Sequence, residues 1–382
     1  MIRKLLFWIH LLVGLAVGIV VLIMSATGVM LAFELQILDW ARPDLPGGEP
    51  SPTAEVMPVE ALLVAGAEAV DSGGRAQSIT FSSDPRDPVD ISYGRRQSVS
   101  LDPYTGQPLA EGSTAWRDFF RWSMGWHRWL GREGDGRQIG KAITGISNLA
   151  FLFLILSGLY LWWPKKLRWS SFRPVLWFTK NKSSKLRDWN WHNVLGFWTA
   201  LPLAFLVATA TFFNYEFPGK WLAAVVGEDE PVAFEAPAVA TALPGGPLAG
   251  IDDAVAGLKA SQDDWNRLSV SLPTSADQPL EVSVDRGNGR QPQKRETLFV
   301  DRATGEILAT RGFGDQSTYR QARTVVRFGH TGEMFGLPGQ IIAAGASFAG
   351  CVLVYTGIAL AFRRLVLRPL RRRERGDVVE AV

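Results

Sequence analysis

The chain contains four histidines, and each lies at the edge of a different long apolar segment: His10, His127, His192 and His330. Histidine is costly inside a lipid bilayer and is also a common ligand of iron. Four histidines placed this regularly favour two cofactor sites with two ligands each. They predict a path for electrons across a membrane.

Four segments contain no Asp, Glu, Lys or Arg: residues 5–33, 142–164, 189–215 and 334–362. A helix needs roughly 20 apolar residues to cross the hydrocarbon core, so each segment is long enough to span a bilayer. A cleaved signal peptide is the alternative for the first segment. Its apolar run is about twice the roughly 7–15 residues of such a peptide, however, and no clear cleavage site follows.

Basic residues cluster between the second and third segments and again in the C-terminal tail. The first cluster consists of Lys165, Lys166, Arg168, Arg173, Lys180, Lys182, Lys185 and Arg187, and the second of Arg363, Arg364, Arg368, Arg371, Arg372, Arg373 and Arg375. The positive-inside rule then places both termini and the middle connector on the cytoplasmic side of the membrane. The net charge of +3 hides this asymmetry and does not indicate nucleic-acid binding.

The expected organisation follows from these segments. It is a first transmembrane helix (1–38), a periplasmic domain ending in a Trp-rich interfacial segment (39–138), a second helix (139–164), a basic cytoplasmic connector (165–188), a third helix (189–216), a second periplasmic domain (217–333), a fourth helix (334–362) and a basic cytoplasmic tail (363–382). The single cysteine, Cys351, excludes an internal disulfide and a CxxCH haem attachment, so any cofactor is held non-covalently.

The chain also repeats itself. Residues 27–33, TGVMLAF, resemble 356–362, TGIALAF, and 157–161, SGLYL, is a looser copy. Residues 99–110 match 298–309, each with a strand, a D-x-x-T-G turn and a second strand, and helix-like stretches at 59–70 and 251–261 precede them. The predicted fold is a membrane protein with a four-transmembrane-helix bundle and two duplicated α+β periplasmic domains.

Duplication pairs the histidines by depth. His10 and His192 both begin a segment that runs outward, so they are expected to meet near the cytoplasmic face. His127 and His330 both precede a segment that runs inward, so they are expected to meet near the outer face. Each site would take one ligand from each half of the chain.

Glycine follows three of the histidines at the i+4 position: Gly14, Gly131 and Gly196. A missing side chain one helical turn away leaves room for a flat macrocycle. His330 has Met334 at this position, which makes Met334 an alternative fourth ligand. Zinc is the competing metal, but two histidines without a nearby carboxylate or thiolate are too few for a structural zinc site.

Three motifs carry a family resemblance: WHRWLG at 126–131, WHNVLG at 191–196 and SGLYLWWP at 157–164. Together with the duplicated strand–DxxTG–strand modules, they resemble the PepSY-associated transmembrane family over nearly the whole chain, and within it the FoxB-type inner-membrane ferric-siderophore reductases. The resemblance implies a location in the bacterial inner membrane, PepSY-like periplasmic domains and two haem b groups. It implies that His10, His192, His127 and His330 are the axial ligands, and that electrons pass outward to release Fe(II) from a ferric siderophore.

Arginine and tryptophan surround the two outer histidines, with Arg128 beside His127 and Arg327 near His330. One interpretation is an aromatic belt with solvated arginines. The other gives Arg128 and Arg327 haem propionates to bind, or an anionic ferric complex to attract.

No electron source is visible, because the cytoplasmic segments are too short to fold around NADPH or flavin. We therefore expect a cytoplasmic donor of the flavin or flavin-reductase type, with membrane lipid as the other partner. Two further functions stay open. One is a membrane-tethered PepSY protein that binds or regulates a peptidase, and the other is an electron conduit to a different periplasmic acceptor.

Overall fold

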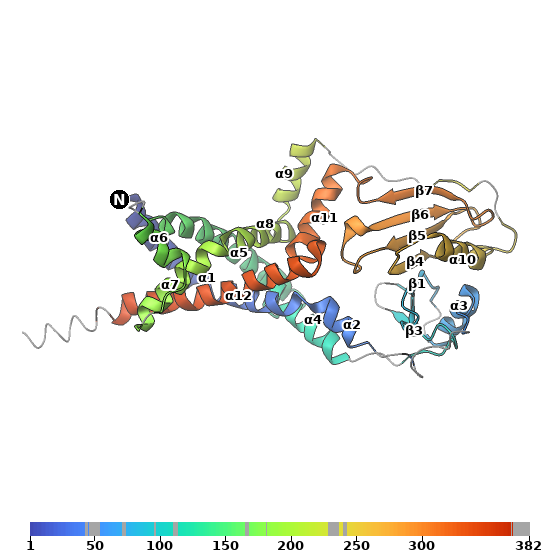
Figure 1. Ribbon diagram of the computed structural model, residues 1–382, viewed down its shortest axis with the longest axis horizontal. Helices are drawn as coiled ribbons and strands as arrows, with labels where there is room; N and C mark the ends of the chain where they lie inside the picture. Colours follow the sequence, from blue (N-terminus) through green and yellow to red (C-terminus); the bar gives the residue numbers. More distant parts are fainter. Residues whose placement is uncertain are drawn as a thin grey trace, which may run out of the picture. The chain divides into compact units, whose positions relative to one another are not determined.

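The computed structural model describes residues 1–42, 45, 54–70, 74–94, 97–109, 114–164, 168–180, 182–227, 237–239, 243–367 and 369 (Figure 1). The chain divides into two compact units. The membrane unit comprises Met1–Ile37, Arg117–Val225 and Val325–Val382, and the sheet unit comprises Leu38–Trp116 and Val226–Thr324.

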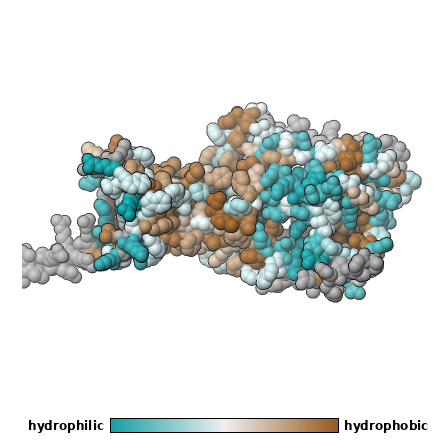
Figure 2. Space-filling model, viewed as in Figure 1, coloured by the Kyte–Doolittle hydropathy of each residue, from teal (hydrophilic) through white to brown (hydrophobic). Residues whose placement is uncertain are grey.

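The membrane unit is built on five helices: α1 (Ile2–Leu31), α5 (Gly136–Trp162), α7 (Ser184–Trp198), α8 (Ala200–Asn214) and α12 (Gly336–Phe362). Helix α1 packs against α5 and α12, α5 packs against α8, and α12 packs against α7 and α8. Hydrophobic residues gather over these helices in Figure 2. Among the described residues, three helices are long and apolar enough to cross a membrane, or four if the bent pair α7 and α8 is one span.

The third apolar segment, predicted as one transmembrane helix over residues 189–216, consists of two helices, α7 and α8, with a bend of 64° between them. The break lies at Thr199, and Pro202 follows in the first turn of α8. Proline has no N–H to donate to the carbonyl group four residues earlier, so the helical hydrogen-bond pattern is interrupted here.

Five shorter helices adjoin these five in the chain: α2 (Glu34–Trp40), α4 (Thr114–Trp129), α6 (Trp169–Leu176), α9 (Phe217–Val226) and α11 (Thr318–His330). Single turns η1 (Pro292–Lys294), η2 (Glu333–Phe335) and η3 (Arg363–Leu367) also occur. Helices α4 and α11 carry His127 and His330 near their C-terminal ends. Of the basic residues that predict the orientation, Lys165, Lys166, Arg368, Arg371, Arg372, Arg373 and Arg375 lie outside the described residues.

The sheet unit contains one antiparallel sheet in the order β3-β2-β1-β4-β5-β6-β7. Its strands are β1 (Ser78–Ser82), β2 (Val89–Ser92), β3 (Ser98–Leu101), β4 (Arg267–Ser271), β5 (Leu280–Asp285), β6 (Arg295–Val300) and β7 (Ile307–Gly312). Strand β1 pairs with β4, with Ile79 opposite Val270. The two domains expected from the duplication therefore share a single sheet, because β1 and β4 each offer an edge that the other completes.

Helices α3 (Val59–Glu68) and α10 (Ile251–Ser261) confirm the two predicted helical stretches and pack their apolar faces on this sheet. The core includes Leu62, Ile79, Val255 and Val270, all almost fully buried. Both D-x-x-T-G segments form tight turns in which Asp102 and Asp301 accept hydrogen bonds from the backbone. In the first copy the second predicted strand is reduced to a single bridge between Leu101 and Pro108.

Candidate functional site

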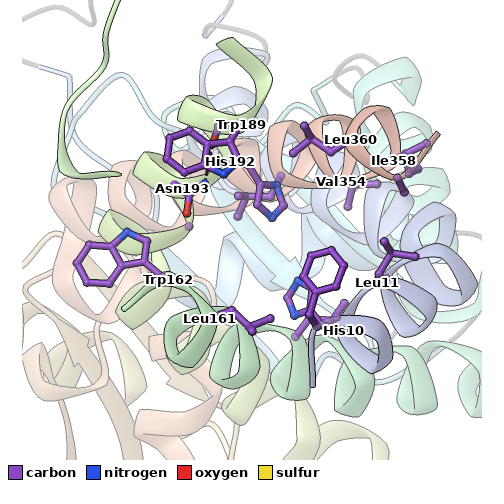
Figure 3. A pocket seen from close by; sticks show the side chains of 18 of the residues that line it. His10, Leu11, Leu161, Trp162, Trp189, His192, Asn193, Val354, Ile358 and Leu360 are labelled. Atoms are coloured by element: carbon purple, nitrogen blue, oxygen red, sulfur yellow. Dashed lines mark hydrogen bonds between the residues drawn. The ribbon is translucent and has the colours of Figure 1, made fainter. Parts of the chain in front are cut away.

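His10 on α1 and His192 on α7 line the same cavity in the membrane unit. Their rings point toward one another across it (Figure 3). The cavity has a volume of about 1170 Å³ and is walled mainly by apolar side chains of α1, α5, α7 and α12. Cofactor and ligand pockets commonly measure roughly 300–1,000 Å³, so this space is sufficient for a large flat group. The structure thus brings together the first pair that the sequence predicted.

His127 on α4 and His330 on α11 form the second pair. Their ring centroids lie 6.4 Å apart and their planes make an angle of 59°. Two imidazoles on opposite sides of one metal would have centroids about 6 Å apart, since each metal–nitrogen bond is about 2 Å and the ring centre lies about 1 Å further. The spacing of this pair therefore fits two axial ligands of one iron.

A hydroxyl group lies beside Nδ1 of every histidine. The Nδ1-to-oxygen distances are 2.8 Å for His10 and Ser157, 3.0 Å for His127 and Thr27, 2.9 Å for His192 and Thr356, and 3.0 Å for His330 and Thr209. Each hydroxyl belongs to a neighbouring apolar helix in the same half of the chain. Because Nδ1 of each ring is engaged by a hydroxyl group, Nε2 of each ring can bind another partner.

The threonine protons decide the direction of these hydrogen bonds. Thr27, Thr209 and Thr356 donate to backbone carbonyls of their own helices, at 2.7, 2.8 and 2.7 Å. Each threonine oxygen therefore accepts a hydrogen bond from Nδ1–H, so the free Nε2 carries the lone pair that binds a metal. Ser157 has a longer hydrogen bond of 3.3 Å to the Leu154 carbonyl, so the protonation of His10 is less firmly fixed.

Glycine follows three of the four hydroxyl residues. A Cβ on Gly158 or Gly357 would lie 3.4 Å from Cε1 of His10 or His192, and one on Gly28 would lie 3.6 Å from Cε1 of His127. The repeated Thr-Gly and Ser-Gly dipeptides thus orient a ring and make room for it. In the sequence these repeats indicate a duplication, but nothing there reveals their contact with the histidines. Thr209 departs from the pattern, since Ala210 follows it.

The predicted glycines have different surroundings. Gly14 and Gly196 line the cavity, and the nearest atoms to an added Cβ belong to Leu154 at 3.9 Å and Leu353 at 3.7 Å. Gly131 lies beyond the end of α4, so the expected helical spacing from His127 does not apply. Its φ of +69° and the Trp126 ring at 2.9 Å from an added Cβ explain the glycine there.

The remaining predicted residues lie near the outer pair in sequence. Met334, the alternative fourth ligand, belongs to the turn η2. The ring next to that of His127 is the ring of His330, which favours His330 as the ligand. Arg128 and Arg327 are exposed, with their guanidinium groups 4.9 Å from the Trp129 ring and 5.5 Å from the Phe328 ring. Across the described part of the chain, no group of three or more His, Cys, Asp or Glu could hold a metal ion. The two pairs would suit a group that supplies its own equatorial ligands, as haem does.

Basic side chains line one end of the cavity of His10 and His192: Arg3, Lys4, Lys185, Arg363 and Arg364. Arg3 donates to the Leu161 and Trp163 carbonyls at 2.6 and 2.9 Å, which satisfies the C-terminal end of α5. Arg363 forms a 2.7 Å ion pair with the buried Asp188. A carboxylate-bearing group in the cavity would meet positive charge at this end.

Comparison with known proteins gives one informative result. No match was found among the curated proteins. The sequence profile of the PepSY-associated TM region, in contrast, matches residues 7–364, a range that includes all four histidines and the whole sheet unit. The chain belongs to this membrane-protein family of PepSY-associated transmembrane proteins.

Proposed function

We propose that this protein is a dihaem inner-membrane reductase that carries electrons from the cytoplasmic side to a periplasmic ferric siderophore, releasing Fe(II). The observation that carries the proposal is the pairing of four histidines whose Nδ1 atoms are all engaged by hydroxyl groups. His10 and His192 would hold the inner haem, and His127 and His330 the outer haem.

When bound, haem b supplies a one-electron carrier, and two histidine ligands leave its iron without an open position for oxygen. The chain's own residues prepare for that group. Thr27, Thr209 and Thr356 hold their imidazoles in one protonation state, and Gly14 and Gly196 keep the backbone of the cavity accessible. Arg128 and Arg327, beside the outer pair, would attract an anionic ferric complex.

In this proposal α7 and α8 together form one bent span, so the chain crosses the inner membrane four times with both termini in the cytoplasm. The basic residues between α5 and α7 support that orientation through the positive-inside rule. The electron donor would be a reduced flavin or a flavin reductase, because the cytoplasmic segments are short.

Haem content and single-site variants test the proposal. The purified protein should contain two haem b per chain. His10→Ala and His192→Ala should remove the same spectral component in a redox titration, and His127→Ala should remove the other. Comparing His330→Ala with Met334→Leu identifies the fourth ligand, since only the ligand's loss should remove the outer component. Haem at one equivalent or less in a fully loaded sample would contradict the pairing.

A further inference from the structure

Helix α9 exposes a continuous apolar face. The exposed fractions of Phe217, Trp221 and Val225 are 58%, 65% and 62%. These residues are spaced four apart, so they lie on the same side of the helix. Ala224 and Lys220 are exposed beside them, whereas Pro218 and Gly219 are buried.

This face adjoins exposed apolar residues of α8, which belongs to the third apolar segment. Phe213, four residues before Phe217, is 40% exposed on α8, and Leu201 at the start of α8 is 82% exposed. Helix α9 begins two residues after Tyr215, whose ring lies 5.7 Å from that of Phe217. Helix α9 therefore begins where the apolar segment of α8 ends (Figure 1), and hydrophobic residues are visible over α9 in Figure 2.

We propose that α9 is an interfacial membrane anchor that lies in the plane of the lipid surface at the end of the third apolar segment. The headgroup and upper acyl region of the bilayer would cover the apolar face of α9. Phe217, Trp221 and Val225 would insert into it, about 5–10 Å deep, as amphipathic interfacial helices do. Tyr215 and Trp221 suit this depth, because aromatic rings with a polar atom collect at the membrane interface.

The position of Lys220 at the rim of the apolar face fits a lipid surface. Lys220 is the only basic residue of α9, its side chain is 78% exposed, and its Nζ lies 3.2 Å from the carboxylate of Glu216 at the helix start. A lysine at the rim of an apolar face can extend its ammonium group to the headgroups while its stem stays among the apolar side chains. The anchor would fix the position of α8, which carries Thr209, and so the height of the outer histidine pair.

Spin labelling tests the proposal and does not depend on haem. The single native cysteine is removed with Cys351→Ser, and Trp221→Cys is labelled in the full chain in phosphatidylcholine nanodiscs. Leu201→Cys is the lipid-facing control, and Asp277→Cys, on an exposed turn of the sheet unit, is the water-facing control. Collisions of the label with oxygen should exceed those with a water-soluble nickel chelate by several-fold at Trp221, as at Leu201.

Two results would overturn the proposal. One is a label at Trp221 with the water accessibility of the Asp277 control. The other is spin–spin broadening at Trp221 that disappears when labelled protein is diluted with unlabelled protein, because this would identify a second copy of the chain as the occupant. Labels at Phe217 and Val225 repeat the measurement if the Trp221→Cys variant does not fold.

Discussion

Gly140 of α5 lies directly against the main chain of Trp129, at the end of the helix that carries His127. A Cβ on residue 140 would overlap the carbonyl oxygen of Trp129. Thr144, one turn later on α5, donates to the Arg128 carbonyl at 3.0 Å. In the other half, Gly339 of α12 lies against the carbonyl oxygen of Gly332, just after His330. Each glycine thus allows the turn after an outer histidine to contact the following apolar helix.

Gly140→Ala should displace the end of α4 and weaken the outer site. Forcing an extra carbon into this contact should cost about 1–3 kcal/mol in the free energy of unfolding. The readout is haem content, with preferential loss of the component assigned to His127. Gly125→Ala is the matched control, because a Cβ at residue 125 of α4 meets no atom within 4 Å. Equal haem content in both variants would show that Gly140 does not position the outer site.

Thr356→Val should alter the inner site while preserving the shape of the side chain. Loss of the acceptor for Nδ1–H of His192 should reduce the affinity of the site by about 10–100-fold, as for other partners of ligating histidines. The reduction potential of the inner component should rise, because a less electron-rich imidazole stabilises Fe(III) less. Thr356→Ser should restore both properties. An unchanged potential in the valine variant would show that the hydroxyl does not act on the ligand.

The outer haem should be the immediate donor to the ferric siderophore, with both haems needed when electrons start in the cytoplasm. Pre-reduced protein should be reoxidised by a ferric siderophore, and Fe(II) should be trapped by a colorimetric chelator. His10→Ala should still pass its stored electron in detergent but fail in sealed vesicles reduced from the cytoplasmic side. Normal turnover of this variant in vesicles would contradict the relay. A series of ferric chelates would define the acceptor.

Much of this arrangement was predictable from sequence, because histidine and uncharged segments are conspicuous in a membrane protein. Their expected depths in the membrane pair His10 with His192 and His127 with His330, and the structure brings each pair together. The bend at Thr199 was missed, since the absence of charge conceals the effect of Pro202. The common sheet was also missed, because nothing local in β1 or β4 specifies a partner so distant in sequence.

Asp188→Asn should destabilise the membrane unit. The Asp188 carboxylate is buried and accepts from Arg187 and Arg363 at 2.9 and 2.7 Å, so its neutralisation leaves two guanidinium groups without their counter-charge. Because both arginines are partly exposed, we expect a loss of about 1–3 kcal/mol, less than for a fully buried pair. Asp118→Asn, which breaks the exposed pair with Arg121, should cost less than about 1 kcal/mol. Thermal unfolding in detergent compares the two.

Lys259 should make the stability of the sheet unit depend on pH. Its Nζ lies 3.5 Å from the ring centroid of Phe81, and burial lowers the pKa of Lys259 from 10.5 to about 8. Between pH 8 and 10.5 the unfolded chain holds a proton that the folded chain has released, so the free energy of unfolding rises with pH. Lys259→Met should abolish this rise. Hydrogen exchange within β1 and β4, corrected for the intrinsic rate at each pH, measures it.

The pairing of β1 with β4 constrains the synthesis of the protein. Thr80 and Ser269 lie side by side in the sheet, with 2.9 Å between their hydroxyl oxygens, yet they are 189 residues apart in the sequence. At about 5–20 residues per second, β4 leaves the ribosome roughly 10–40 s after β1. Helices α5, α7 and α8 are made in that interval, while one edge of β1 still lacks its partner. An unpaired strand edge invites aggregation, so the first half of the chain should depend on a chaperone or on rapid membrane insertion until the second half arrives.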